Sequence, residues 1–269
     1  GISIYRYIYS PPSRVISVMM KKRSEIGHSD LPYTCPHTEE IVQDIVNALV
    51  LPEDAVVVDL GCGRGALLRH IVQTCTGPRG SGIGVDREAT VLSNWPETAH
   101  NNIETCESDL LTWVENAALS SHQYDAVLCI GALPENQQPQ TIEKVLQITK
   151  PGGYVVVGEL VFVSPPCQEF LDYLQVTPTS YGNISELKSW FTNHKCEICY
   201  EKMQSLEAYE MHLYNNVRNW ALPEPNDCST DADEKNKILD ISRTWVEFSS
   251  KHGWRTWEFA TVVVRKPFE

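Results

Sequence analysis

The stretch Val56-Val-Val-Asp-Leu-Gly-Cys-Gly-Arg-Gly65 (VVVDLGCGRG) indicates the fold of this chain. Its apolar first half, broken only by Asp59, is typical of a strand buried on both faces of a parallel sheet. Three glycines follow at alternate positions, and glycine is used where a turn needs unusual backbone angles or a ligand approaches the backbone closely. Residues 66–73 (ALLRHIVQ) then have helical periodicity. The stretch therefore predicts a strand, a ligand-binding loop and a helix in succession.

The same alternation of strands and helices continues on both sides of this unit. Thr38 is placed to cap a helix, and Ile142, Val145, Leu146 and Thr149 recur with the spacing of a second helix face. Alternation of this kind implies crossover connections and a parallel sheet covered on both faces, an α/β fold. The predicted strands are 55–61, 80–86, 102–109, 124–131, 153–163, 196–203 and 257–266.

Two helical stretches separate the last two predicted strands. One carries apolar residues from Leu206 to Trp220, and the other runs from Ile238 to a stop at Gly253. We predict that residues 205–252 form an inserted helical cap. The core is then 38–204 with 253–269, and residues 1–37 are an N-terminal extension covering the pocket.

Composition limits the classes of partner. The chain has 269 residues and a formal charge of −13, which disfavours nucleic acid as a substrate. No apolar run approaches the roughly 18 residues of a membrane-spanning helix, so no membrane association is expected. The nine cysteines form no disulfide framework, and Cys196 and Cys199 lack a second metal-binding pair, which favours a reduced, cytoplasmic compartment and no metal site.

The beginning of the chain has a different character. Residues 1–23 carry five basic side chains and no acid, so organellar targeting stays open. Met19 and Met20 are alternative starts, which leaves open whether residues 1–18 belong to the native protein. The oligomeric state is not predicted.

Three carboxylates near strand ends indicate the ligand. Asp59 lies two residues before the first glycine of a GxGxG loop, where it favours an ammonium group over a pyrophosphate. Asp86 ends the second predicted strand and can accept hydrogen bonds from ribose hydroxyls. Asp109 can accept from an adenine amine while Leu110 packs against the base. Ribose, adenine and an aminoacyl group together describe S-adenosyl-L-methionine.

Five motifs in this order resemble the class I S-adenosylmethionine-dependent methyltransferases: VVVDLGCGRG, GIGVD, ESDL, YDAVLCIGAL and KPGGYVVVGE. The resemblance covers roughly residues 38–160 and the terminal strands. It implies a Rossmann-like, seven-stranded, mostly parallel sheet with an antiparallel last strand. It also implies that Asp59, Gly61 and Gly63 contact the methionyl part, Asp86 the ribose, and Asp109 with Leu110 the adenine. The implied cofactor set is completed by Cys62, Arg87, Ser108, Ile130 and Gly131.

The acceptor is less sharply defined. Residues 130–134 (IGALP) lack the motif of enzymes that methylate the amines of bases, and GEL at 158–160 resembles a group of small-molecule methyltransferases. We therefore expect methyl transfer to an oxygen, nitrogen or sulfur atom of a small molecule. A protein or RNA methyltransferase and a non-catalytic cofactor-binding scaffold are the alternatives.

Candidates for the acceptor side come from the strand ends and the covering segments. Glu159 interrupts an apolar strand at its carboxyl end and is the first candidate for a general base, with His212 as the second. Tyr33, His37, Tyr209 and Trp220 are the predicted acceptor contacts.

Cys167 follows two prolines in SPPCQEF (164–170), a sequence similar to the nucleophile turn of cytosine methylases. In those enzymes the turn follows the fourth strand, whereas here it follows the fifth. We therefore expect Pro165 and Pro166 to stiffen the exit from the sheet. A role for Cys167 as the nucleophile of the methylation reaction is not expected.

Overall fold

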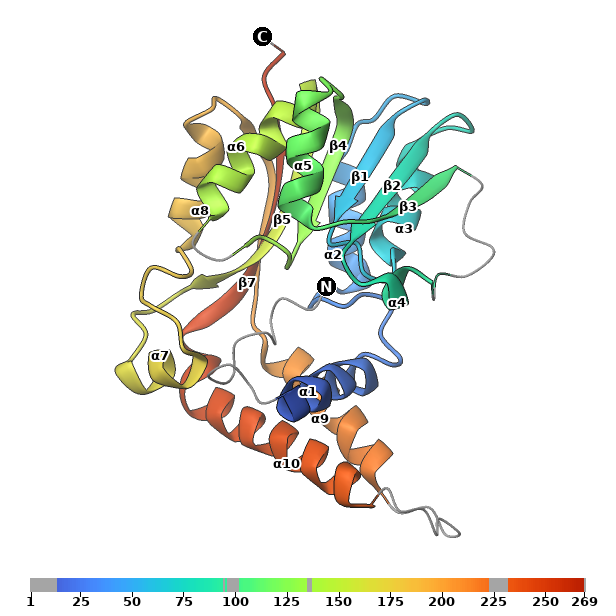
Figure 1. Ribbon diagram of the computed structural model, residues 1–269. Coiled ribbons are helices and arrows are strands. Elements are labelled where there is room, and N and C mark those ends of the chain that lie inside the picture. Colours follow the sequence, from blue (N-terminus) through green and yellow to red (C-terminus); the bar gives the residue numbers. More distant parts are fainter. Residues whose placement is uncertain (1–13, 94, 96–101, 135–136, 223–231, 269) are drawn as a thin grey trace.

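The computed structural model describes residues 14–93, 95, 102–134, 137–222 and 232–268 (Figure 1). Seven strands form one sheet in the order β3-β2-β1-β4-β5-β7-β6. The strands are β1 (Val56–Leu60), β2 (Ser81–Asp86), β3 (Ile103–Glu107), β4 (Tyr124–Ile130), β5 (Thr149–Phe162), β6 (Glu197–Gln204) and β7 (Trp257–Arg265).

The sheet has the predicted mixture of directions. Strands β1 to β5 pair in parallel, and β7 is antiparallel to both of its neighbours, so the predicted Rossmann-like architecture is confirmed. In β4 every residue is buried, as expected for a central strand covered on both faces.

Helices cover both faces of the sheet. Figure 1 shows α5, α6 and α8 on one face and α2 and α3 on the other. The helices of the core are α2 (Glu39–Ala48), α3 (Ala66–Cys75), α4 (Ala89–Leu92), α5 (Leu110–Leu119), α6 (Gln138–Ile148), α7 (Gln168–Leu174) and α8 (Ile184–Thr192). Each face has its own buried apolar cluster.

Local signals explain where several helices begin. Thr38 caps α2 as predicted, because its hydroxyl oxygen accepts a hydrogen bond from the backbone N–H of Ile41. Asn183 and Glu186 form a reciprocal capping box at the start of α8. Thr149, expected on the helix preceding it, instead begins β5, although its hydroxyl still donates to the carbonyl of Val145 in α6.

The remaining helices lie together beyond one end of the sheet (Figure 1). They are α1 (Arg14–Gly27), α9 (Glu207–Ala221), α10 (Ala232–Phe248) and the short π-helical turn η2 (Ser249–Gly253). All but α1 come between β6 and β7, where the helical insertion was predicted. The extension predicted at residues 1–37 contributes α1, which packs on α9 and α10, while residues 1–13 lie outside the described part.

Candidate functional site

A pocket opens beside the glycine loop, at the end of the sheet that faces the helices of the insertion. Its walls are residues 32–35, the end of β1 with the loop and the start of α3, and Ile130 at the end of β4. The space measures about 420 Å³, including the part open to solvent. Tyr33, one of the predicted acceptor contacts, lines this pocket.

The glycine loop has the backbone that its sequence predicts. Gly61 has φ +76°, and Gly63 has φ +54°, in the left-handed region that favours glycine. A Cβ atom on Gly61 would lie 2.4 Å from the Cβ of Ala132. The N–H groups of Gly61 and Cys62 both donate to the carbonyl of Val85, which fixes the loop to the end of β2.

Asp59 places a buried carboxylate in the wall of this pocket. Its side chain is only 4% exposed, and within the described part of the chain it makes no hydrogen bond or ion pair. The pKa of Asp59 is raised to about 7, mainly by burial and to a smaller extent by the nearby carboxylate of Asp86. A cationic group bound in the pocket would stabilise the ionised form of Asp59.

Asp86 is joined to the glycine loop. One carboxylate oxygen accepts from the N–H of Gly63 at 3.0 Å, and the other accepts from the N–H of Glu88 at 3.0 Å. An ionised carboxylate offers about four acceptor positions, so one carboxylate can serve several donors. Arg87 is exposed beside it, with its Nε 3.9 Å from an oxygen of Glu88.

Asp109 has a structural role that the sequence analysis did not include. It is the N-cap of α5, and its Oδ1 accepts from the N–H groups of Leu111 and Thr112. The side chain is exposed and Leu110 is half-buried, which leaves Oδ2 open to a ligand. Ser108 links the two acidic sites, because its N–H donates to the carbonyl of Asp86.

Two of the glycines leave space for an aromatic side chain. The indole of Trp95 lies where side chains on Gly65 and Gly84 would otherwise be, within 2.1 Å and 2.8 Å of their ideal Cβ positions. Its Nε1 donates to the carbonyl of Gly63 at 2.9 Å, and the guanidinium of Arg69 lies 5.0 Å from the ring centroid. Trp95 was not among the predicted residues, because its distance from the loop along the chain hides the contact.

The predicted base Glu159 faces away from this pocket. Along β5 it has the same orientation as Val157 and Val161, which belong to the apolar cluster under α5, α6 and α8. The pocket residues Asp59 and Ile130 face the other side. Glu159 is 4% exposed, and its Oε1 accepts from the backbone N–H of Leu160. Within the described residues, it is not part of the pocket wall.

The predicted face of α9 is covered by the N-terminal segment. The hydroxyl of Tyr209 lies 2.7 Å from Nε2 of His28, and Nε2 of His212 lies 3.0 Å from a carboxylate oxygen of Asp30. Trp220 is flanked by the ammonium groups of Lys22 and Lys235, each within 6 Å of the ring centroid. The three side chains face one way, as predicted, and that way is toward α1 and the residues after it.

His28 is a polar residue that the sequence analysis missed. Burial lowers the pKa of His28 to about 4, so the ring is neutral near pH 7. Its Nδ1 lies 2.6 Å from the carbonyl of Ser24 and must donate there, so Nε2 accepts the Tyr209 hydroxyl proton. Its own carbonyl accepts from Arg64 of the glycine loop at 3.3 Å. His28 therefore connects the loop to α9.

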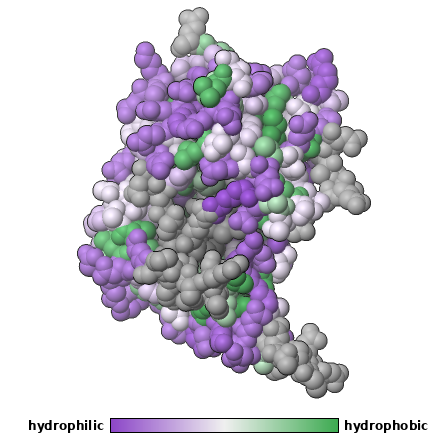
Figure 2. Space-filling view, viewed as in Figure 1, coloured by the Kyte–Doolittle hydropathy of each residue, from purple (hydrophilic) through white to green (hydrophobic). Residues whose placement is uncertain are grey.

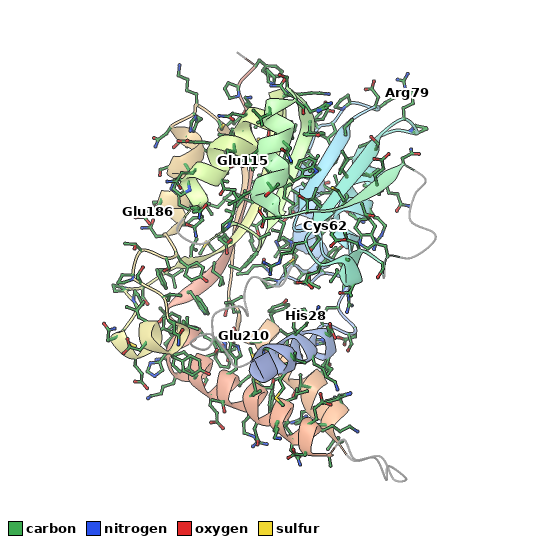
Figure 3. The ribbon with its side chains drawn as sticks, viewed as in Figure 1. His28, Cys62, Arg79, Glu115, Glu186 and Glu210 are labelled. Carbon is green, nitrogen blue, oxygen red and sulfur yellow. The ribbon has the colours of Figure 1, made fainter. Side chains whose placement is uncertain are left out.

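Two other buried groups lie outside the pocket. His37 is buried against β7, with Nε2 2.8 Å from the hydroxyl of Thr261, and burial lowers its pKa to about 4. Glu210 of α9 is 1% exposed and accepts from Nε1 of Trp254 at 2.7 Å. Burial raises the pKa of Glu210 to about 7. Figure 3 shows Cys62 at the end of the sheet, with His28 just after α1 and Glu210 on α9 facing it.

Comparison with known proteins places this geometry in context. A family model described as "Methyltransferase domain" matches residues 51–240. No curated protein matches the sequence significantly.

Solved structures share the fold over most of the chain. One is a SAM-dependent methyltransferase from Geobacter sulfurreducens in complex with S-adenosyl-L-homocysteine, with 18% identity, a TM-score of 0.69, and coverage of 90% of this chain and 97% of that one. Another, from Thiobacillus denitrificans and with the same ligand, has 20% identity, a TM-score of 0.68, and coverage of 89% and 96%. Coclaurine N-methyltransferase bound to N-methylheliamine has 14% identity, a TM-score of 0.61, and coverage of 96% and 89%.

Proposed function

The chain belongs to the methyltransferase-domain family and is an S-adenosylmethionine-dependent methyltransferase, and from this premise we propose that its acceptor is a small organic molecule. The methyl group would pass to an oxygen, nitrogen or sulfur atom of that molecule. When bound, S-adenosyl-L-methionine supplies a methyl group already activated on a sulfonium, whose sulfur leaves as a thioether.

The placement of the methyl donor rests on the state of Asp59. A buried carboxylate with a raised pKa and no partner in the described part of the chain is suited to an incoming ammonium, such as that of the methionyl part. We assign the backbone of Gly61 and Gly63 to the same part. We assign the carboxylate of Asp86 to the ribose hydroxyls, and Oδ2 of Asp109, beside Leu110, to the adenine amine.

The other predicted cofactor contacts fit around this placement. Cys62 and Ile130 line the pocket. Gly131 has φ +61°, and its N–H donates to the carbonyl of Gly158 at 2.7 Å, so it turns the chain sharply where β4 ends. These residues shape the wall, while Arg87 and Ser108 flank the ribose-binding carboxylate.

The protein's task in the transfer is to align the acceptor with the methyl group and the leaving sulfur. Alignment alone contributes up to roughly 7–11 kcal/mol in ideal intramolecular cases, and a base is needed only for an acceptor that is protonated at the working pH. Glu159 and His212 stay predictions for that base. A loss of turnover of a hundredfold or more in Glu159→Gln would support Glu159, and a rate close to native would remove it.

Three observations support a small acceptor over a macromolecule. The formal charge of −13 opposes binding of nucleic acid. The helices between β6 and β7, together with α1, stand over the end of the sheet where the pocket opens (Figure 1). Among the residues coloured in Figure 2, the visible face is largely hydrophilic, with its apolar side chains in separate patches. In the described part of the chain no helix is both long and apolar enough to cross a bilayer.

The test is methyl transfer from labelled S-adenosyl-L-methionine to a cell extract separated into small-molecule and macromolecular fractions. We expect label in the small-molecule fraction, identified by mass. Label confined to protein or RNA would establish the first alternative. Tight binding of S-adenosyl-L-homocysteine without transfer to either fraction would favour the non-catalytic scaffold. Asp86→Ala serves as the control, because it should lose both binding and transfer.

A further inference from the structure

Three polar side chains meet where the chain leaves the sheet, away from the pocket described above. Cys167 immediately precedes α7, Glu169 lies in its first turn, and His252 lies in η2. The Sγ of Cys167 lies 3.5 Å from Nδ1 of His252. On the other side of the ring, Nε2 of His252 lies 3.3 Å from Oε1 of Glu169. The trio thus joins the segment after β5 to the segment before β7.

The order of the three groups is that of a nucleophile, a base and a carboxylate whose charge supports the base. The carboxylate of Glu169 lies 3.3 Å from Nε2, which makes no hydrogen bond within the described part of the chain, and its negative charge favours the tautomer with the proton on Nε2. In that tautomer Nδ1 presents its lone pair to the thiol. Nδ1 can therefore accept the thiol proton as the sulfur attacks. The negative charge of Glu169 also stabilises the imidazolium that forms when Nδ1 takes the thiol proton. As a single exposed ion pair, it contributes little to the stability of the fold.

The imidazole is held in place by its surroundings. The side chain of His252 is 13% exposed, and its ring lies 5.1 Å from that of Phe248. The hydroxyl of Thr256 donates to the carbonyl of His252, and that of Ser164 donates to the carbonyl of Arg255, so the two segments stay side by side. The base is therefore ordered, whereas Cys167 is exposed to reagents.

Metal binding is not supported at this place. Among the described residues, no group of three or more His, Cys, Asp and Glu side chains is arranged to hold a metal ion. Proton transfer from the thiol to His252 is the chemistry that the geometry supports.

We propose that Cys167 is a nucleophilic thiol and a site of modification by small disulfides. The Sγ–H bond breaks as its proton passes to Nδ1 of His252, and the sulfur attacks one sulfur of the disulfide. An S–S bond forms to Cys167 while the S–S bond of the reagent breaks. The departing thiolate takes the proton from His252, so that one thiol is released and no further oxidant is required.

The chain contains an internal comparison. Cys167 and Cys199 are the exposed cysteines of the described residues. Cys199 lies in β6, its thiol is directed at the carbonyl of Glu197, and burial raises its pKa. Cys228 lies outside the described residues, so Cys228→Ser is the background for every protein in the test.

The experiment treats the full-length protein with 2-hydroxyethyl disulfide, a neutral reagent, at about pH 7 and follows each cysteine by peptide mass mapping. We expect Cys167 to react at least tenfold faster than Cys199. His252→Gln should slow Cys167 to within threefold of Cys199 and leave the rate of Cys199 unchanged. Equal rates at the two cysteines before any further substitution would overturn the proposal.

A second variant covers the case in which His252→Gln perturbs the fold. Glu169 has a side chain that is 61% exposed, so Glu169→Gln should fold normally. It should slow the reaction of Cys167 threefold or more, because the imidazolium formed in the step loses its neighbouring negative charge. An unchanged rate in Glu169→Gln, together with an unchanged rate in a folded His252→Gln, would show that proximity to His252 has no effect on the thiol. Thermal unfolding and S-adenosyl-L-homocysteine affinity confirm that each variant is folded.

Discussion

Asp59 leads to a quantitative prediction for cofactor binding. In the ligand-free protein its pKa is raised to about 7 by burial, so the group is mostly protonated below that pH. If the bound ammonium returns the pKa to an ordinary value near 4, binding favours the ionised form and affinity increases with pH. The ionised fraction of a group with pKa 7 rises about 15-fold between pH 5.5 and 7.0, and the dissociation constant should fall by the same factor.

The assay is a calorimetric titration with S-adenosyl-L-homocysteine, which carries the same ammonium and is not consumed. The pH range of the titrations, 5.5 to 7.0, stays below the pKa of that α-amino group, which is about 7.7–8.0 in model compounds. Asp59→Asn should bind more weakly at pH 7.0 and lose the pH dependence. Glu210→Gln is the matched control, since Glu210 is also a buried carboxyl with a pKa raised to about 7, but it lies in α9.

Two results would refute the reasoning. A dissociation constant that does not change between pH 5.5 and 7.0 in the native protein would show that Asp59 does not meet the ammonium. A full pH dependence retained in Asp59→Asn would assign the effect to another group. Either result can be interpreted only if the control, Glu210→Gln, binds S-adenosyl-L-homocysteine with the pH dependence of the native protein.

Three further predictions concern stability. The pKa of Glu210 is raised to about 7, so between about pH 5 and 7 the folded state keeps a proton that the unfolded chain loses. The free energy of unfolding should therefore fall as pH rises through this range, by up to about 1.4 kcal/mol per pH unit. Glu210→Gln should reduce that slope, measured by urea titrations at several pH values. An unchanged slope contradicts this. Gly61→Ala should lower the free energy of unfolding by roughly 1–3 kcal/mol, because of the φ of +76° and the close contact with Ala132. The same urea titrations measure this loss, and an unfolding midpoint equal to that of the native protein would argue against strain. Tyr209→Phe should lower the free energy of unfolding by about 1 kcal/mol, because it removes the hydrogen bond to His28. An unchanged free energy of unfolding would mean that water replaces the tyrosine hydroxyl as the partner of His28.

The sheet was predictable because its signals are local and repeated. Each strand is a short apolar run followed by a loop signal, and the alternation with helices determines parallel pairing. Caps such as Thr38 are equally local. Short helices were harder to predict: α5 begins immediately after the predicted ligand residue Asp109, and its capping role was hidden by the ligand interpretation.

The acceptor side was less predictable because its contacts join distant segments. The face of α9 that carries Tyr209 and His212 has the same sequence pattern whether an acceptor or α1 covers it. Glu159 illustrates another difficulty, since a strand buried on both faces has no alternation from which the direction of one side chain can be deduced. The approach of His252 to Cys167 depends on how the chain returns to the sheet before β7. The sequence contains no residue spacing from which this contact could be predicted.

The position of the insertion between β6 and β7 has an evolutionary consequence. Gln204 and Phe259 are paired in adjacent antiparallel strands, so the segment between them leaves and re-enters the sheet at neighbouring points. The entropy cost of closing such a loop grows only slowly with its length. A lineage can therefore lengthen, shorten or replace this segment while the strands that hold the methyl donor stay intact. Diversification of acceptors would then need changes in one contiguous stretch of the gene, with the donor site inherited unchanged.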